Sequence, residues 1–339
     1  MVQCAVVILN WNGERHLREF LPSVVEHTPC EVAEIIVADN GSTDGSLELL
    51  RSQFPDIKVV DLGQNYGFAR GYNEALSGLY HKYFILLNSD VKVSEGWIEP
   101  LIAELRDDAS VGAVAPKLLS YSEPTHFEYA GASGGYIDIL GYPFCRGRML
   151  NHTEEDRGQY DDAKDLFWVS GAAFGCRAEL FKELGGFDSD FFAHMEEIDL
   201  CWRMQLRGYR VRVVPRSVVY HLGGGTLSKT SPQKLYLNHR NNLAMLFKCA
   251  PTGQRILVAV ARPTLDFAAS LSYLLQGDWR GAWAVFRAYG TFIAWHPRLF
   301  RKRKAVRSAR TSESKYIYRG SVVWNFFRGR KHFSDLLFK

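Results

Sequence analysis

The first third of the chain alternates short apolar runs with amphipathic stretches, and this pattern constrains the fold more than any other feature. The apolar runs lie at residues 5–9, 35–38, 58–61 and 83–87, and helical spacing lies at 14–26, 42–51, 68–79 and 95–105. Strands separated by helices of this length predict a mostly parallel sheet with helices on both faces. We therefore expect an α/β fold.

The pattern changes twice farther along. From about residue 111 to 174, glycines, aromatic residues and short strand signals follow irregularly; a helix at 197–207, two short strands at 210–214 and 217–220, and a helix at 232–248 come next. Beyond Pro251 the chain turns to apolar helices and then to a basic tail. This predicts one unit over 1–250, divided near 110, and a helical C-terminal extension over 251–339.

Polar residues follow four predicted strands of the first unit. In open α/β sheets ligands bind at the carboxyl ends of the strands, so four polar ends together predict a binding rim. Any one of these segments alone would be an ordinary turn, because Asn, Asp and Gly are common turn formers. The residues of the rim are Asn10, Trp11 and Asn12, then Asp39, then Asn65 and Gly67, and finally Asn88, Ser89 and Asp90.

The chemistry of this rim suits a nucleoside diphosphate held by a cation. The glycine-rich dinucleotide fingerprint and the Walker pattern are both absent, so the backbone offers no ready phosphate cradle. A diphosphate then needs a divalent cation, Mg²⁺ or Mn²⁺, for which the Asp90 carboxylate is a suitable hard ligand. Trp11 offers a ring on which a base can stack, and Asp39 can accept a hydrogen bond from a base N–H.

At these positions the sequence resembles the family 2 inverting nucleotide-sugar glycosyltransferases, and among them the bacterial rhamnosyltransferase-like subgroup. The resemblance covers about residues 3–245. It implies the GT-A fold, with a Rossmann-like sheet, a nucleotide-binding half over 1–110 and an acceptor-binding half over 111–250. The segments that carry it are Asn10-Trp11-Asn12, Asp39-Asn40-Gly41-Ser42-Thr43-Asp44-Gly45-Ser46, Asn65-Tyr66-Gly67-Phe68-Ala69, Leu87-Asn88-Ser89-Asp90, Val169-Ser170-Gly171-Ala172-Ala173, Gly185-Gly186-Phe187-Asp188 and Glu196-Glu197-Ile198-Asp199-Leu200-Cys201-Trp202-Arg203.

The resemblance also implies roles for residues of the nucleotide half. Trp11 and Asp39 would contact the nucleobase, while Asn65, Gly67 and Asn73 would shape the nucleotide cleft. Asp90 would be the last Asp of a metal-binding D-x-D motif whose first Asp is replaced by Asn88, which removes one carboxylate from the metal site. His221 matches a position that ligates the metal in some members, although a lone histidine at a strand end can also be a plain polar residue.

The acidic start of the helix near 197 would carry the chemistry. An inverting transfer needs a carboxylate that takes the proton of the acceptor hydroxyl, and the resemblance makes Glu197 this base, with Glu196 in reserve. Acidic residues also simply favour helix N-termini. Trp168, Gly171 and Asp199 are expected beside the acceptor. Trp168 could equally be buried, and the four-residue spacing of Asp199 and Arg203 also predicts an ordinary ion pair.

Two further groups could reach the phosphates. The glycines at 223–225 with Lys229 predict either a lid over the diphosphate or a plain surface loop. Arg240 could reach phosphate or face solvent.

The C-terminal extension predicts attachment to a membrane surface. Residues 296–339 hold 13 basic and 2 acidic residues, whereas the rest of the chain holds 28 basic and 35 acidic ones. Apolar helices beside a basic cluster are typical of a peripheral anchor on an anionic leaflet; the alternative is a packed helical subdomain with a solvated basic face. No nucleic-acid recognition module surrounds the basic run, so nucleic acid is not an expected partner.

The expected protein is thus a cytoplasmic enzyme on the inner face of the cell membrane, since no basic leader precedes the first strand and cysteines are sparse. It would transfer a sugar, with dTDP-rhamnose as the best guess for the donor, to a lipid-linked glycan in cell-surface polysaccharide synthesis. Two alternatives remain open: an inactive relative that acts as a binding or scaffold protein, and a nucleotidyltransferase.

Overall fold

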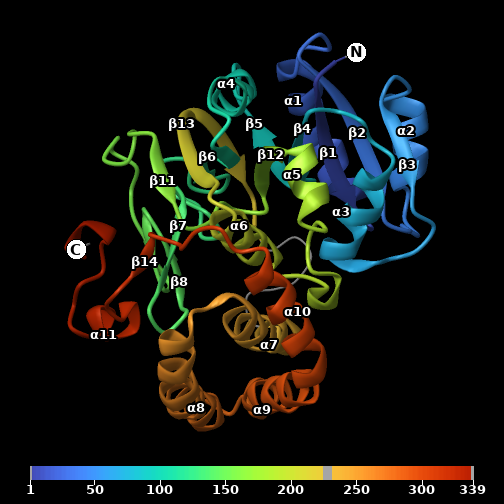
Figure 1. Cartoon of the computed structure of the whole chain (residues 1–339). Helices are drawn as coiled ribbons and strands as arrows, with labels where there is room; N and C mark the ends of the chain where they lie inside the picture. Colours follow the sequence, from blue (N-terminus) through green and yellow to red (C-terminus); the bar gives the residue numbers. More distant parts are fainter. Residues whose placement is uncertain (1, 224–230, 337–339) are drawn as a thin grey trace.

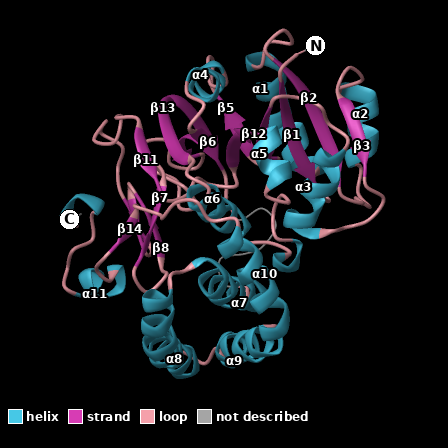
Figure 2. Ribbon diagram, in the orientation of Figure 1, coloured by secondary structure: helices cyan, strands magenta, loops and turns pink. Residues whose placement is uncertain are grey.

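A central mixed sheet organises the molecule in the computed structural model, which describes residues 2–223 and 231–336. Within these ranges the sheet has nine strands in the order β11-β13-β6-β12-β4-β1-β2-β3, with β5 paired to β13 (Figures 1 and 2). The four strands expected from the sequence run parallel at one side. They are β1 (Cys4–Asn10), β2 (Ala33–Asp39), β3 (Lys58–Asp61) and β4 (Tyr83–Asn88).

Helices cover both faces of this sheet, as the sequence predicts. One core cluster packs Val6 and Ile8 of β1 against one set of helices, and the second packs Ala5 and Val7 against the other set, because neighbouring residues of a strand point to opposite faces. The first set is α1 (Glu14–His27), α2 (Ser46–Gln53) and α4 (Glu99–Asp107). The second is α3 (Gly67–Ser77), α5 (Ala178–Glu183) and α6 (Glu196–Leu206).

The second half of the unit predicted over residues 1–250 extends the same sheet. β12 (Ala173–Arg177) lies antiparallel between β4 and β6 (Val111–Ser120), and β13 (Arg210–His221) lies parallel to β6. β13 corrects the prediction of two separate strands at 210–214 and 217–220, because one strand runs through both. The remaining strands of the sheet are β5 (Val91–Val93) and β11 (Lys164–Leu166).

A small second sheet joins this unit to the end of the chain. Its order is β10-β9-β8-β7-β14. β14 (Ile317–Tyr318) pairs in parallel with β7 (Gly135–Asp138), so the C-terminal extension contains a strand where only helices were expected. The other members are β8 (Pro143–Cys145), β9 (Arg148–Met149) and β10 (His152–Thr153).

The C-terminal helices pack below the sheet in the view of Figure 1. α7 (Pro232–Cys249) contacts α6, α9 and α10, and α8 forms a hairpin with α9. Among the residues described, no helix combines the length and apolarity that a membrane span requires. The other elements here are α8 (Thr252–Leu275), α9 (Trp279–Ala294), α10 (His296–Ser308) and α11 (Val322–Phe327).

Candidate active site

The predicted rim forms at the carboxyl ends of β1 and β2. Asn10 and Asp39 are adjacent in the register of these strands, both are fully buried, and Asn10 Nδ2 donates to Asp39 Oδ2 at 3.2 Å. Asp39 Oδ1 accepts from the backbone N–H of Ser42 at 2.8 Å. These bonds hold the Asp39 carboxylate in one orientation at the end of the sheet, whereas the ring of Trp11 remains 43% exposed beside it.

Asn12 and Asn65 shape the loops of the rim. Asn12 adopts a positive φ of 49°, and its Oδ1 accepts from the backbone N–H of Thr43 at 2.7 Å. Asn65 Oδ1 accepts from the backbone N–H of Gly67 at 2.8 Å, at the start of α3. Both side chains thus bond to nearby backbone. We expect them to shape the nucleotide cleft by fixing these segments.

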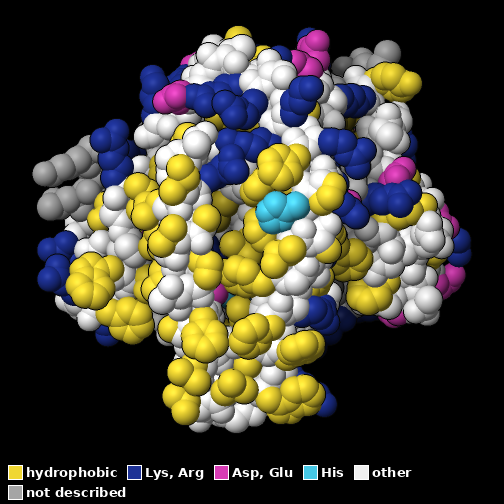
Figure 3. All heavy atoms as spheres, turned by 60° about the horizontal axis from the view of Figure 1, so that its bottom comes forward, with side chains coloured by type: hydrophobic (Ala, Val, Ile, Leu, Met, Phe, Trp, Pro, Cys, Tyr) yellow, Lys and Arg dark blue, Asp and Glu magenta, His cyan; other side chains and the backbone are white. Residues whose placement is uncertain are grey.

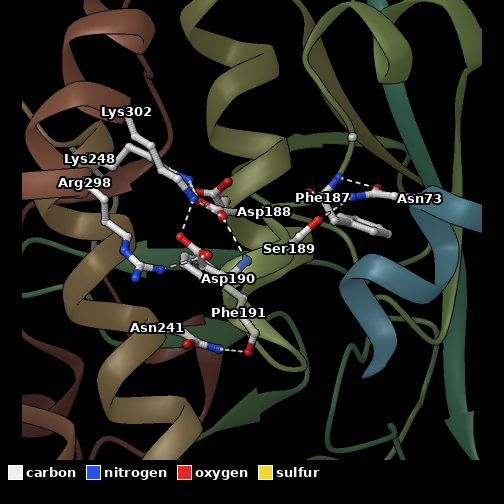
Figure 4. A network of polar contacts seen from close by, with 12 residues as sticks. Asn73, Phe187, Asp188, Ser189, Asp190, Phe191, Asn241, Lys248, Arg298 and Lys302 are labelled. Carbon is white, nitrogen blue, oxygen red and sulfur yellow. Dashed lines mark hydrogen bonds and ion pairs between the residues drawn. The ribbon is translucent and has the colours of Figure 1, made fainter. Parts of the chain in front are cut away.

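Asn73 lies where it holds a loop of the protein. Its Nδ2 donates to the carbonyl of Phe187 at 2.8 Å and to Ser189 Oγ at 3.1 Å, while its Oδ1 accepts from the Phe187 N–H at 2.9 Å (Figure 4). These bonds use both ends of the amide. Asn73 therefore positions the segment that leads to α6.

Asp90 and His221 lie together, and Asn88 and Ser89 at the end of β4 are half-buried. His221 Nε2 is 3.2 Å from Asp90 Oδ1, and His221 Nδ1 is 3.3 Å from Glu128 Oε1. All three side chains of this cluster are at least nine-tenths buried.

The charges of this cluster support one another. Burial alone would raise the pKa of Asp90, but hydrogen bonding and charge from His221 outweigh it and lower that pKa. Burial alone would lower the pKa of His221, yet the Glu128 and Asp90 carboxylates raise it to about 10. The imidazole is therefore an imidazolium between two carboxylates when no cation is bound.

Among the described residues no group of three His, Cys, Asp or Glu side chains is placed to hold a metal ion, but Asp90 and a deprotonated His221 could supply two ligands to a divalent cation. A carboxylate oxygen and an imidazole nitrogen 3.2 Å apart can share one ion. Histidines that bind metals commonly give their second nitrogen to a carboxylate, which is the place of Glu128. The sequence missed Glu128, because it lies in the irregular stretch after β6 and outside any motif.

Glu196 and Glu197 begin α6, and burial raises the pKa of both. For Glu197 the pKa rises to about 7, although nearby backbone N–H groups oppose the shift. For Glu196 the charge of Glu197 adds to burial, and the pKa lies well above the ordinary value. The Oε2 atom of each side chain is buried without a hydrogen-bond partner among the described residues. Such a pair is suited to holding and exchanging a proton near neutral pH.

Gly171 leaves room beside Glu197. A Cβ atom on Gly171 would lie 3.9 Å from the Glu197 Cβ and 3.4 Å from the Phe68 ring. The two other residues expected near an acceptor are buried. Trp168 is 3% exposed and donates its ring N–H to the Tyr136 carbonyl. It is therefore a buried residue, which is the alternative that the sequence left open.

Asp199 is a structural residue of the core. It has no exposed surface with which to contact an acceptor, and it forms ion pairs with Arg203 at 2.8 Å and with Lys248 at 2.7 Å. The ion pair with Arg203 has the four-residue spacing that the sequence predicts.

Arg240 contacts the protein backbone and does not face solvent. It is buried, and it donates to the carbonyls of Asp190 and Phe191 at 3.1 and 2.9 Å. The candidate lid falls largely outside the described residues, because Gly224, Gly225 and Lys229 lie in the range 224–230.

Comparison with known proteins gives consistent relatives. The family model described as "Glycosyl transferase family 2" matches residues 5–185. The N-acetylglucosaminyl-diphospho-decaprenol L-rhamnosyltransferase of Mycobacterium tuberculosis is 25% identical over 259 residues, which cover 71% of this chain and 83% of that protein. The O-antigen biosynthesis protein RfbC of Myxococcus xanthus is 28% identical over 214 residues, 60% of this chain and 16% of that protein.

Solved structures match most of the chain at low identity. S. aureus TarS 1–349 superposes with a TM-score of 0.58 at 17% identity, covering 97% of this chain and 92% of that one. The mannosyltransferase PcManGT from Pyrobaculum calidifontis, solved with GDP-Man and Mn²⁺, gives a TM-score of 0.53 at 16% identity, covering 91% and 85%. These likenesses extend the shared fold beyond the residues of the family model.

Proposed function

The chain belongs to glycosyl transferase family 2 and has the GT-A fold, and from this membership we propose that it transfers one sugar from a nucleoside diphosphate sugar to an acceptor hydroxyl with inversion. The observation that carries the proposal is the Glu197 carboxyl, half-buried at the start of α6 beside Gly171 with its Oε2 atom enclosed, and with a pKa of about 7. A base of this pKa is matched to neutral pH.

In the proposed reaction the acceptor oxygen attacks the anomeric carbon of the donor. The O–C1 bond forms while the bond from C1 to the phosphate oxygen breaks, and the nucleoside diphosphate leaves with that electron pair. The hydroxyl proton passes to Oε2 of Glu197, which has no other described partner. Attack from the face opposite the leaving group gives inversion.

The rim residues support the donor half of the proposal. Trp11 offers an exposed ring for the base, and Asp39 is braced at the strand end by Asn10. Asp90 and His221 would hold a divalent cation, Mg²⁺ or Mn²⁺, with diphosphate oxygens and water completing its coordination. The cation would supply positive charge for the departing diphosphate.

We propose dTDP-rhamnose as the donor and a lipid-linked glycan as the acceptor, in cell-surface polysaccharide synthesis. The support is the Mycobacterium relative, whose name states both rhamnosyl transfer and an N-acetylglucosaminyl-diphospho-decaprenol acceptor. UDP- and GDP-sugars are the competing donors, since S. aureus TarS 1–349 was solved with UDP-GlcNAc and the mannosyltransferase with GDP-Man.

A donor screen tests this function. Purified protein is given dTDP-rhamnose, UDP-GlcNAc or GDP-mannose, with and without Mn²⁺, and both donor binding and release of the nucleoside diphosphate are measured. We expect slow, cation-dependent hydrolysis of one donor, and loss of hydrolysis with retained binding in Glu197→Gln. Absence of binding for every donor would favour the scaffold alternative. Release of pyrophosphate from a nucleoside triphosphate would favour a nucleotidyltransferase.

The membrane surface forms a second part of the proposal. The outer face of the α8–α9 hairpin is apolar (Figure 3), and α10 beside it carries six basic residues and no acidic one. An apolar face with a basic border favours an anionic leaflet, with about 1 kcal/mol for each Lys or Arg near the surface. The exposed apolar side chains of the hairpin include Ile256, Val260, Phe267, Leu271, Leu274, Leu275, Trp279, Trp283, Phe286 and Ile293.

Vesicle flotation tests the membrane surface. The Trp279→Ser/Trp283→Ser variant should lose most binding to vesicles that contain phosphatidylglycerol. Tyr80→Ser, which removes an exposed aromatic ring between α3 and β4, should bind as the unaltered protein does. Equal binding by both variants, or no binding by the unaltered protein, would support the packed-subdomain alternative.

A further inference from the structure

The segment 186–195, called the base-entry loop here, leads directly into the helix that carries Glu197. Near its end Phe192, His194 and Met195 have φ angles of 65°, 69° and 72°. Residues other than glycine are disfavoured in this left-handed region, so such conformations persist only where surrounding contacts impose them. The contacts that impose this shape therefore decide where α6 begins and where its first carboxylates point.

The end of the base-entry loop is held through its backbone. Asn241 Nδ2 of α7 lies 2.9 Å from the Phe191 and Ala193 carbonyls and 2.7 Å from that of His194. The backbone N–H groups of Phe68 and Ala69 at the start of α3 donate to the Phe192 carbonyl at 2.7 and 3.0 Å. These bonds join the loop to the nucleotide half and to the C-terminal helices at once.

The acidic part of the loop is held by cations from two C-terminal helices (Figure 4). Lys248 of α7 lies 2.6 Å from Asp188. Lys302 of α10 bridges Asp188 and Asp190, at 2.8 Å from the latter, and Arg298 lies 3.0 Å from Asp190. Burial opposes ionisation of Asp188, yet the two lysines hold its pKa well below the usual range.

We propose that Lys302 and Arg298 of α10 are positioning residues for the general base, acting through the base-entry loop. The inference rests on the proposed role of Glu197. Glu197, the base-entry loop and α10 all lie beyond residues 5–185, so this whole arrangement falls outside the matched family region. Misplacement of a catalytic group by about 1 Å can cost a hundredfold in rate.

A purely stabilising role predicts a different result from substitution. The side chains of Lys302 and Arg298 are 34% and 45% exposed, and the buried Asp188 keeps its ion pair with Lys248 when Lys302 is removed. Removing one of them should therefore leave the fold intact. A positioning role predicts a large effect on turnover together with this small effect on stability.

The test compares variants of the full chain. Lys302→Ala removes the bridge, Lys302→Arg keeps a cation, and Lys304→Ala is the matched control, since Lys304 is exposed on the same helix and forms no ion pair with any described residue. Each is measured for thermal unfolding, dTDP-rhamnose binding and hydrolysis, and the infrared carboxyl band of Glu197 between about pH 5 and about pH 9. The band is assigned by its loss in Glu197→Gln.

We expect Lys302→Ala to lower hydrolysis at least about tenfold with little change in donor binding or unfolding temperature. The midpoint of the Glu197 band should also fall from about pH 7, because a relaxed loop admits water to the carboxyl. The other titratable groups that act on or with Glu197 are Glu196, Cys201 and Cys145, and none is altered. Lys302→Arg should restore most of the rate.

Each contrary outcome has a distinct meaning. If Lys302→Ala matches Lys304→Ala in rate and in the band midpoint, the positioning role is wrong. If Glu197→Gln hydrolyses the donor as the unaltered protein does, the proposed base is wrong, and the inference fails with it. Should Lys302→Ala not fold, Arg298→Gln provides the same comparison, and an unchanged midpoint and rate there would also overturn the proposal.

Discussion

Burial of the Glu197 carboxyl sets the pH range in which it can act as a base. Its pKa is about 7 in the folded protein against 4.5 for an ordinary Glu, so transfer should rise with pH through about 7. The folded state binds the proton more tightly than the unfolded state, so stability falls as pH rises through this window. A pH–rate profile whose acid limb lies near an ordinary carboxyl pKa would contradict this.

The same reasoning gives Glu197→Gln an unusual pair of effects. The variant should be inactive. Above pH 7 its free energy of unfolding should exceed that of the unaltered protein by about 1–3 kcal/mol, because a buried charge is removed. Its unfolding temperature should be higher as well. Thermal unfolding at about pH 5 and about pH 8 measures the difference. An equal or lower stability of the variant at the higher pH would count against a desolvated carboxylate.

Glu128 should act on metal binding through His221. Glu128→Gln removes the carboxylate from His221 Nδ1, and loss of such a partner typically weakens metal affinity about 10- to 100-fold. Mn²⁺ titration in the presence of dTDP, followed by electron paramagnetic resonance, measures it. Glu123→Gln, an exposed site in the same segment, is the control. Equal affinities in the two variants would show that His221 needs no such partner.

At this scale the sequence locates polar residues at strand ends more readily than it identifies the partners of residues elsewhere. Asn10, Asp39 and Asp90 lie at or just after strand ends and meet at one edge because strand register dictates it. Asn73, Trp168 and Asp199 were assigned to ligands but contact other parts of the protein. The partners of Asn73 and Trp168 lie far away along the chain, so local patterns carry no information about them. Asp199 pairs with Arg203 at the spacing that the sequence predicts, and only its second partner, Lys248, is distant.

At the scale of elements, the start of α3 depends on a glycine. Gly67 has a φ of +75°, and a Cβ atom there would lie 2.5 Å from the Phe192 ring. Gly67→Ala should therefore destabilise the fold by about 1–3 kcal/mol and lower the transfer rate, because it displaces the base-entry loop. Gly78→Ala, at the other end of α3 with nothing within 4 Å, should be neutral. Chemical denaturation compares them, and equal stabilities would refute the clash.

β13 shows why the sequence predicts two strands where the structure has one. Pro215 interrupts the apolar pattern, which predicts two strands. In the structure Val214 and Val218 pair with Pro116 and Lys117, which are consecutive on β6, so the intervening residues form a bulge. Proline is tolerated at bulges because it need not donate a ladder hydrogen bond there. A single sequence does not distinguish a bulge from a break.

At the scale of the whole molecule, the C-terminal segment packs onto the small second sheet. β14 pairs with β7, and the Val322 N–H donates to Asp138 Oδ2 at 2.9 Å. The Phe333 ring stacks on the Tyr136 ring with their centroids 5.5 Å apart. The sequence predicted a helical extension, since a strand of two residues has no detectable period. Pairing between such distant segments is decided by the tertiary fold.

Truncation tests this dependence. Removal of residues 313–339 should lower the unfolding temperature by several degrees, because it uncovers the apolar rings on β7 and β8 and leaves the edge of β7 unpaired. Differential scanning calorimetry measures it. An unfolding temperature equal to that of the full chain would mean that the small sheet is stable without β14.

The contacts between the base-entry loop and α10 also have a consequence while the ribosome is making the protein. A chain emerges from the ribosome N-terminus first, at about 5–20 residues per second. The rim, the proposed cation ligands and Glu197 are all made before Lys302 joins Asp188 and Asp190. If α10 positions the base, a nascent chain can bind a donor before it can turn it over. Activation then coincides with completion of the helices proposed to meet the membrane, which would spare the cell donor hydrolysis by unfinished enzyme away from its acceptor.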